Sequence, residues 1–189
     1  MEIPGPAAES PVESALRLAN EAVERRLIGS YAVAGAFAFI FHGEPFETKD
    51  LDLMMKLSLT PGGLVDLAPV WRHFVEGGAV EEGQFLRLSR ILVDIVPAGD
   101  ALDDEALRDA ITAPVGRQSG RFLTAEHAVA IAVRTGRPRD QMKIARLLAS
   151  APEAVDHGRL EDVLERHGLL EAWRSLRPVR EPTGGEGAP

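Results

Sequence analysis

The sequence predicts an α+β protein in which a small mixed sheet is followed by a helical subdomain. In the first part of the chain, extended apolar runs alternate with helical ones, which favours a sheet with helices between its strands. Further along, helical patterns alone follow one another, joined by short connections. We therefore expect an α/β core at residues 11–123 and a helical subdomain at 124–176, between a flexible N-terminus at 1–10 and a flexible tail at 177–189.

The elements of the core follow from apolar periodicity and from the positions of glycine and proline. Apolar residues at helical spacing after Pro11 predict a first helix, and Gly35 separates a short strand from a buried helix. A Thr-Pro-Gly-Gly turn at 60–63 ends the next strand, and Pro97 ends the last one. The expected helices are 12–27, 36–42, 64–75 and 103–111, and the expected strands are 31–34, 51–59, 84–88 and 91–96. The segment 115–123 contains two glycines and has only some strand character.

The helical subdomain is expected to contain four helices. Thr124 is a suitable N-cap for the first, and Pro138 suits the start of the second. The expected ranges are 125–134, 139–149, 158–167 and 169–176.

Composition and the lengths of the apolar runs exclude cysteine-based sites and membrane-spanning helices. Of the 189 residues, 45% are hydrophobic and 26% are charged, which is typical of a soluble globular protein. The absence of cysteine excludes disulfides, thiolate metal sites and cysteine nucleophiles, so oxygen or imidazole must hold any metal. The longest apolar run is far shorter than the roughly 20 residues that a membrane span needs, and the N-terminus does not resemble a signal peptide. We expect a cytoplasmic protein without a membrane partner.

A net charge of −8 argues against a broad surface for binding nucleic acid. One local basic patch is present, formed by Arg134, Arg137, Arg139, Lys143 and Arg146. This patch is a candidate for binding a triphosphate or a nucleic acid, and a solvated helix face is an equally good interpretation.

Three aspartates on two predicted strands form the main candidate site. Asp50 and Asp52 are two residues apart, so on a strand their carboxylates point the same way. Carboxylates that close repel one another unless a cation neutralises them, and magnesium prefers such hard oxygen ligands. Asp94 lies within an apolar strand, where an unpaired charge is costly to bury, and it would complete a metal site if its strand lies beside the first. A solvated pair, or salt bridges to Lys49, Lys56 or Arg90, are the alternatives.

Gly35 stands at the expected junction of a strand and a helix, shortly before the aspartates. A glycine there allows backbone N–H groups to approach a phosphate closely, although for a single glycine a tight turn without a ligand is the more common explanation.

Taken together, these segments resemble the DNA polymerase beta-like nucleotidyltransferase superfamily, nearest the branch that contains type IV toxin–antitoxin toxins. The stretches YAVAGAFAFIFHGEPFETKDLDLMM and RILVDIVPAG match its pattern, in order, at Gly35, His42, Gly43, Thr48, Asp50, Asp52 and Asp94. The stretch AEHAVAIAVRTGRPRDQMKIARLL matches its later helices at Glu126, His127, Gly136, Arg137, Arg139 and Asp140. The resemblance covers about residues 28–150.

The resemblance implies a nucleotidyltransferase fold and a magnesium-dependent (or manganese-dependent) enzyme. Such an enzyme moves a nucleoside monophosphate from a nucleoside triphosphate to a hydroxyl of RNA, protein or a small molecule. It implies that Asp50, Asp52 and Asp94 are the catalytic metal ligands. The expected nucleotide-binding residues are Gly35, Ala36, Thr48, Arg137, Arg139, Asp140 and Lys143. The implied partners are a nucleoside triphosphate, an acceptor such as tRNA or protein, and an antitoxin.

The sequence departs from the pattern of this branch at three positions. Ala36 replaces the usual Gly or Ser, Phe46 stands where an arginine is common, and Ala132 replaces a lysine. Arg134, Arg137 and Lys143 are the candidates to supply the missing positive charge. A lysine lost from a fixed position is not automatically replaced by an arginine elsewhere, because the two side chains differ in shape and in how they bind phosphate. These departures leave a second interpretation open, a nucleotidyltransferase-fold module that binds a nucleotide or a partner without transferring anything.

Overall fold

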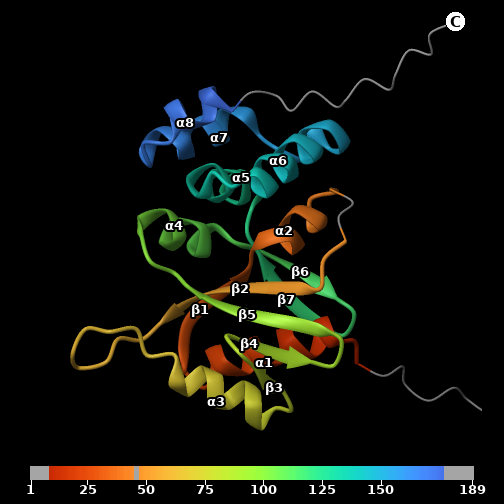
Figure 1. Ribbon diagram of the computed structural model, residues 1–189, viewed down its shortest axis with the longest axis vertical. Coiled ribbons are helices and arrows are strands. Elements are labelled where there is room, and N and C mark those ends of the chain that lie inside the picture. The colour runs from red at the N-terminus through yellow and green to blue at the C-terminus, as the bar shows by residue number, and fades with distance from the viewer. Residues whose placement is uncertain (1–8, 45–46, 177–189) are drawn as a thin grey trace, which may run out of the picture.

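The computed structural model describes residues 9–44 and 47–176. Within them the chain forms a seven-stranded mixed sheet with helices on both faces (Figure 1), which confirms the predicted α+β class. The expected flexible tail at 177–189 lies outside the described residues, as do Phe46 and most of the expected flexible N-terminus at 1–10.

The elements follow one another in an order close to the expected one. The helices are α1 (Pro11–Glu24), α2 (Gly35–Phe41), α3 (Ala68–Glu76), α4 (Ala101–Asp109), α5 (Ala125–Thr135), α6 (Pro138–Ser150), α7 (His157–Arg166) and α8 (Leu170–Ser175), with a 3-10 turn at Pro152–Ala154. The strands are β1 (Ile28–Val33), β2 (Asp50–Leu57), β3 (Val80–Glu82), β4 (Phe85–Leu88), β5 (Ile91–Pro97), β6 (Ile111–Val115) and β7 (Gln118–Phe122). None of the described helices has both the length and the apolar character needed to span a bilayer.

The strand order places β2 at the centre of the sheet. The order is β3-β4-β5-β2-β1-β7-β6, with β2 parallel to β5 and β1 parallel to β7. All the other neighbouring pairs are antiparallel. Two strands that are far apart in the sequence, β2 and β5, are therefore direct neighbours.

Side-chain alternation along β2 divides the core into two layers. Leu51, Leu53 and Met55 are fully buried in the layer that contains α1 and α3. Met54 belongs to the other layer, which contains α2, α4 and the C-terminal helices α5 to α7. Because strand side chains alternate, Asp50 and Asp52 face this second layer.

The second face of the sheet is only partly covered. Helices α2 and α4 lie over β2, and α4 also contacts β1, with α5 to α8 stacked beyond them in Figure 1. On β5, Leu92, Asp94 and Val96 keep partial exposure, and Arg87 of β4 is exposed. This uncovered area, the open face of β4 and β5, borders the aspartates.

A sharp turn between α5 and α6 fixes where the first residues of α6 lie. Helix α5 ends at Gly136, whose φ of 65° is a left-handed conformation that glycine adopts without strain. Pro138 then occupies the first turn of α6, where its missing N–H costs nothing. Asp140 and Lys143 consequently lie in the first two turns of α6.

The structure corrects the bounds of predicted helices and assigns a segment that the sequence leaves undetermined. The helix expected at 64–75 begins only at Ala68, because Thr60 accepts a hydrogen bond from Leu64 and closes a small hairpin, which projects from the body in Figure 1. The helix expected at 103–111 ends at Asp109, and Ile111 already belongs to β6. The undetermined segment 115–123 contains strand β7, which pairs with β6 in a hairpin.

Candidate functional site

The three aspartates lie on one face of two neighbouring parallel strands. In the register of β2 and β5, Asp52 is paired with Asp94, and Asp50 is paired with Leu92. Directly paired residues in a sheet point to the same face, and so do residues two positions apart. Asp50 is exposed, whereas Asp52 and Asp94 are half-buried. The sequence predicted the common face of Asp50 and Asp52, and the register adds Asp94 to it.

Gly35 lies directly against the carboxylate of Asp52. A Cβ atom built on Gly35 would lie 1.6 Å from Oδ2 of Asp52 and 2.6 Å from its Cγ, so no side chain fits there. The φ of Gly35 is also positive, at 54°. The backbone N–H of Ala34 donates to the carbonyl oxygen of Asp52 at 2.9 Å, which joins the start of α2 to β2. A glycine is thus required because the α2 backbone packs on this carboxylate.

The fold disfavours ionisation of two of these carboxyl groups. Burial raises the pKa of Asp52 to about 6, and the negative charges of Asp94 and Asp50 add to this, while Lys143 opposes it. Burial also raises the pKa of Asp94, with a further contribution from Asp50. In a metal-binding site this pattern is expected, because clustered carboxylates are stable as anions only when a cation neutralises them.

The structure does not contain the alternative arrangement, in which the three aspartates form salt bridges. Among residues 9–44 and 47–176, no Lys or Arg nitrogen lies within 4.0 Å of a carboxylate oxygen of Asp50, Asp52 or Asp94. Lys56, one of the expected partners, donates instead to both carboxylate oxygens of Asp104, at 2.6 and 2.8 Å. The negative charge of the three aspartates is therefore available to a cation.

Lys143 is the cation that acts on this cluster. Its Nζ lies 2.9 Å from Oδ1 of Asp140, whose Oδ2 accepts a hydrogen bond from the Thr135 hydroxyl at 2.8 Å. Both side chains of this ion pair are largely shielded, at 13% and 14% exposure. Arg134 cannot take this role, because it is paired with Asp100 and Asp103. Of the three cations considered for the charge missing at Ala132, Lys143 has the supporting geometry.

A cavity of about 730 Å³ opens beside Asp50, between α2, the segment before β2, and the start of α6. It is lined by Phe37, Ile40, Glu47, Thr48, Lys49, Asp50 and Arg139. The hydroxyl of Thr48 accepts a hydrogen bond from the backbone N–H of Asp50 at 3.2 Å and so shapes the entry into β2. The cavity combines apolar walls with both signs of charge.

The remaining predicted residues have more varied positions. Ala36 is buried in the first turn of α2, which has no side-chain cap. Arg137 is exposed and serves as the N-cap residue of α6, where its carbonyl accepts hydrogen bonds from Asp140 and Gln141. The structure thus brings Gly35, Asp140 and Lys143 to the aspartates, and Thr48 and Arg139 to the adjoining cavity, but gives Arg137 a role in starting a helix.

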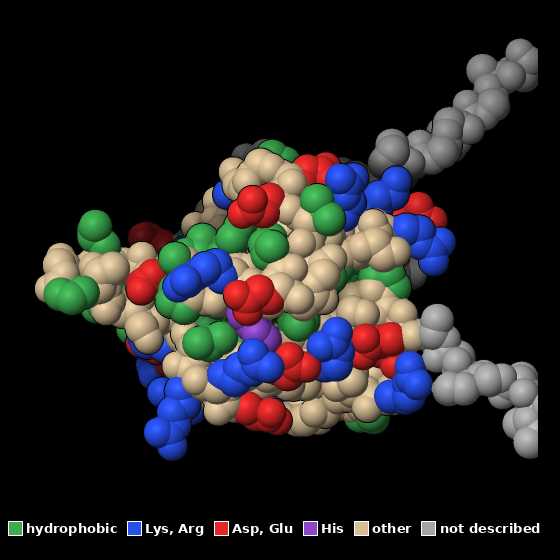
Figure 2. All heavy atoms as spheres, turned by 90° about the horizontal axis from the view of Figure 1, so that it is seen from below, with side chains coloured by type: hydrophobic (Ala, Val, Ile, Leu, Met, Phe, Trp, Pro, Cys, Tyr) green, Lys and Arg blue, Asp and Glu red, His purple; other side chains and the backbone are tan. Residues whose placement is uncertain are grey.

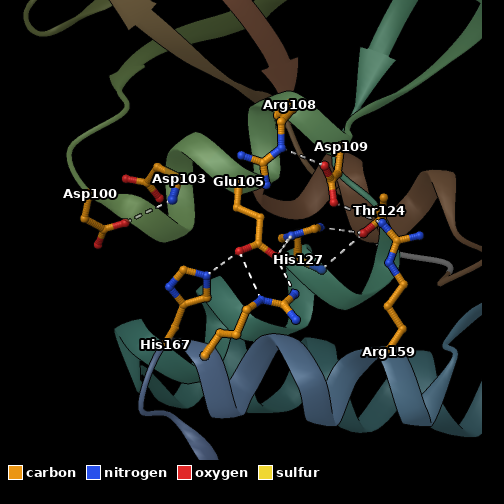
Figure 3. A network of polar contacts seen from close by, with 10 residues as sticks. Asp100, Asp103, Glu105, Arg108, Asp109, Thr124, His127, Arg159 and His167 are labelled. Atoms are coloured by element: carbon orange, nitrogen blue, oxygen red, sulfur yellow. Dashed lines mark hydrogen bonds and ion pairs between the residues drawn. The ribbon is translucent and has the colours of Figure 1, made fainter.

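A second polar cluster links α4 to α5 and α7 (Figure 3), and no spacing pattern in the sequence indicates it. Glu105, Asp109 and His127 are the one group of three potential ligands within the described residues whose ligand atoms all lie within 4.8 Å of one another. The carboxylates of the three aspartates do not all approach so closely, as expected for like charges that repel.

This second cluster is already neutralised by cations. Glu105 contacts Arg166 at 2.6 Å and His167 at 2.8 Å, and the hydrogen bond from Arg166 is the main reason that its pKa falls to about 2. Asp109 contacts Arg159 at 3.4 Å. Since a metal would have to displace these partners, the cluster is better explained as a structural network that joins three helices.

Among the described residues, no broad basic area is visible on the opposite face of the protein. Figure 2 shows the face of α1 and α3, where acidic and basic side chains are intermixed. This distribution agrees with the net charge of −8 and gives no support to a large surface for nucleic acid on that face.

Neither a protein-family model nor a curated protein matches the chain. Solved structures do match it. A nucleotidyltransferase-like antigenic protein from Paracoccidioides brasiliensis has a TM-score of 0.51 and 13% identity, covering 86% of this chain and 91% of that one. ANT(2'')-Ia in complex with adenylyl-2''-tobramycin has a TM-score of 0.51 and 14% identity, covering 86% and 99%. The solution structure of ANT(2'')-Ia has a TM-score of 0.50 and 16% identity, covering 88% and 98%. The chain therefore has a nucleotidyltransferase fold.

Proposed function

We propose that the protein is a divalent-metal-dependent nucleotidyltransferase, which moves a nucleoside monophosphate from a nucleoside triphosphate to a hydroxyl group. The observation that carries this proposal is the arrangement of Asp50, Asp52 and Asp94 on one face, with the Asp52 carboxylate packed on Gly35. The raised pKa of Asp52 supports a site built for a cation, because the cluster lacks a compensating ion pair.

The three carboxylates would hold magnesium or manganese, both of which prefer oxygen ligands. When bound, the metal neutralises the charge of the triphosphate and of the departing pyrophosphate. Asp94 also accepts the proton of the attacking hydroxyl, and its raised pKa suits a group that takes up a proton. The acceptor oxygen bonds to the α-phosphorus while the bond to the β-phosphate oxygen breaks, and pyrophosphate leaves.

Positive charge and backbone groups complete the proposed site. Lys143, oriented by Asp140, provides a cation close to Asp52 for the triphosphate. Gly35 allows the α2 backbone to approach a phosphate, and Ala36 contributes no hydroxyl, so contacts there come from backbone N–H groups. We also propose that residues 11–123 form the catalytic core and that residues 124–176 form a helical subdomain that supplies Lys143.

A small-molecule hydroxyl is the acceptor that we favour. ANT(2'')-Ia, which shares the fold, was solved with adenylyl-2''-tobramycin, an adenylylated small molecule. RNA and protein hydroxyls, together with an antitoxin partner, are the alternatives suggested by the resemblance to the toxin branch, and the net charge of −8 does not favour RNA. A cytoplasmic location remains part of this proposal.

A non-catalytic binding module is the second candidate. Ala36 lacks a hydroxyl for a phosphate, and Ala132 is buried within α5, where its carbonyl caps the end of the helix. Such a protein would bind nucleotide and metal without turnover.

Incubation with each of the four radiolabelled nucleoside triphosphates, magnesium and pools of hydroxyl acceptors tests the two candidates. We expect transfer by the wild-type protein and its loss in Asp52→Asn and Asp94→Asn. Glu161→Gln, which removes a carboxylate from the exposed surface of α7, is the matched control and should keep full transfer. Nucleotide binding without transfer to any pool would reject the enzyme and support the binding module.

A further inference from the structure

The cavity beside Asp50 has a composition that suits the nucleoside part of a nucleotide. Its volume of about 730 Å³ lies within the range of roughly 300–1,000 Å³ that is typical of small-ligand sites. Phe37 and Ile40, one helical turn apart on α2, form an apolar wall, and both remain partly exposed. Arg139 of α6 lies on the same cavity and is exposed, so it is free to meet a phosphate.

The position of the cavity favours the triphosphate over the acceptor. Asp50, a proposed metal ligand, belongs to its lining, whereas Asp94 does not. No lining residue comes from β4 or β5. An acceptor hydroxyl must reach Asp94, and it can do so over the open face of β4 and β5. The cavity on the α2 side is then left for the group that is attached to the triphosphate.

Among the described residues that line the cavity, Glu47 is the one acidic side chain other than Asp50, and it provides a means to select the base. Glu47 is exposed and belongs to the lining. An ionised carboxylate only accepts hydrogen bonds. Adenine, cytosine and guanine each carry an exocyclic amino group that can donate a hydrogen bond. Uracil has no amino group, and its exocyclic groups are carbonyl oxygens, which only accept.

We propose that this cavity is the nucleoside subsite of the nucleotidyltransferase proposed above, on which this inference rests. The base packs on Phe37 and Ile40, and Glu47 favours bases that carry an amino group over uracil. The geometry requires no base-specific contact from the apolar wall, because every base has a face that can pack against an aromatic ring.

Binding measurements separate this subsite from the metal and triphosphate site. Non-hydrolysable analogues of the four triphosphates, and tripolyphosphate as the probe without a nucleoside, are titrated calorimetrically into the full chain in the presence of magnesium. We expect each analogue with an amino group to bind more tightly than tripolyphosphate. Phe37→Ala should bind the analogues about 10- to 100-fold more weakly than the wild-type protein, because it removes a stacking contact. Its affinity for tripolyphosphate should be unchanged.

Phe41→Ala is the matched control on the same helix. Phe41 stacks on Phe122, with ring centroids 4.1 Å apart, and lies outside the cavity. Its removal should leave all affinities unchanged. If Phe37→Ala does not fold, Phe37→Leu keeps the apolar packing and should still weaken the binding of the analogues several-fold.

Glu47→Gln tests the selection of the base. The wild-type protein should bind the uridine analogue about 10-fold more weakly than the others, and the variant, whose amide can also donate, should lose most of this difference. Equal affinity for all four analogues in the wild-type protein would overturn the role of Glu47.

The outcomes also distinguish this inference from the proposed function. Tripolyphosphate that binds with magnesium, without any gain from a nucleoside, overturns the subsite but leaves the proposed function standing. A nucleoside gain that survives in Phe37→Ala places the base elsewhere. A Phe37→Ala variant with normal analogue affinity and a raised KM for the acceptor would assign the cavity to the acceptor. If neither probe binds, the proposed function itself is overturned.

Discussion

Replacement of Asp52 by asparagine should stabilise the metal-free protein at neutral pH, although it removes a residue of the proposed site. Asparagine has nearly the same shape as aspartate but carries no charge. Asp52 is half-buried, shares its face with Asp50 and Asp94, and has no ion pair within 4.0 Å in the described part of the chain. The variant therefore removes a repulsive interaction while it preserves most of the packing against Gly35.

The magnitude follows from the pKa of the Asp52 carboxyl, which rises from 3.8 to about 6 in the folded protein. Each pKa unit corresponds to about 1.4 kcal/mol, so keeping this group ionised in the folded state costs up to about 3 kcal/mol. Well below pH 3.8 the group is protonated in both states and nothing is lost. As the pH rises to about 6, the unfolded chain releases the proton first, and the free energy of unfolding of the wild-type protein falls.

Urea unfolding in the presence of EDTA at a series of pH values measures this effect. We expect the free energies of unfolding of Asp52→Asn and of the wild-type protein to agree at about pH 3 and to differ by up to about 3 kcal/mol at about pH 7, with the variant more stable. Glu161→Gln removes one negative charge from the exposed surface and should follow the wild-type curve, which controls for the net charge of −8.

Magnesium or manganese should reverse the order. A metal that binds only the folded wild-type protein stabilises it, so its melting temperature at neutral pH should rise with metal concentration, and that of Asp52→Asn should not. If Asp52→Asn is no more stable than the wild-type protein at neutral pH without metal, burial and the neighbouring aspartates do not destabilise the ionised Asp52 carboxylate, and the reasoning fails.

Three further predictions follow from other contacts. Gly35→Ala should lower the free energy of unfolding by about 2 kcal/mol or more, because its Cβ would overlap Asp52 and its φ is positive; unchanged thermal unfolding would contradict the contact. Lys143→Met should raise the pKa of Asp52 further, since Lys143 is the group that lowers it, and the carboxyl resonance followed by NMR should then titrate at a higher pH than in the wild-type protein. Glu105→Gln should destabilise the protein by roughly 2 kcal/mol at neutral pH, because it leaves Arg166 without its anion. The pKa of Glu105 is lowered from 4.5 to about 2, so the difference in the free energy of unfolding, measured with urea, should disappear as the pH falls through that interval. A difference that persists at the low end of the interval would argue against the ion pair.

Local patterns predicted those features that depend on a few neighbouring residues. The common face of Asp50 and Asp52 follows from the two-residue period of a strand, and the start of α5 follows from the Thr124 cap. The pairing of Asp94 with Asp52 could be stated from the sequence only as a condition, because it depends on which strands become neighbours in the sheet.

Features that depend on contacts between distant segments were missed or left undetermined. Strand β3 has three residues, too few to show alternation, and β6 carries Pro114, which a strand tolerates at the edge of a sheet. The hydrogen bond of Thr135 to Asp140, which orients Lys143, crosses the turn between two helices. No spacing rule identifies such a contact before the turn at Gly136 is known.

The contact between Gly35 and Asp52 ties two positions of the chain together. A side chain at position 35 is compatible with the fold only if position 52 loses its carboxylate. Among relatives, position 35 should therefore diversify only in lineages that have already given up the acid at position 52. The pair provides a marker, readable from sequence alone, that would separate descendants that retain the proposed metal site from those that use the same fold for another purpose.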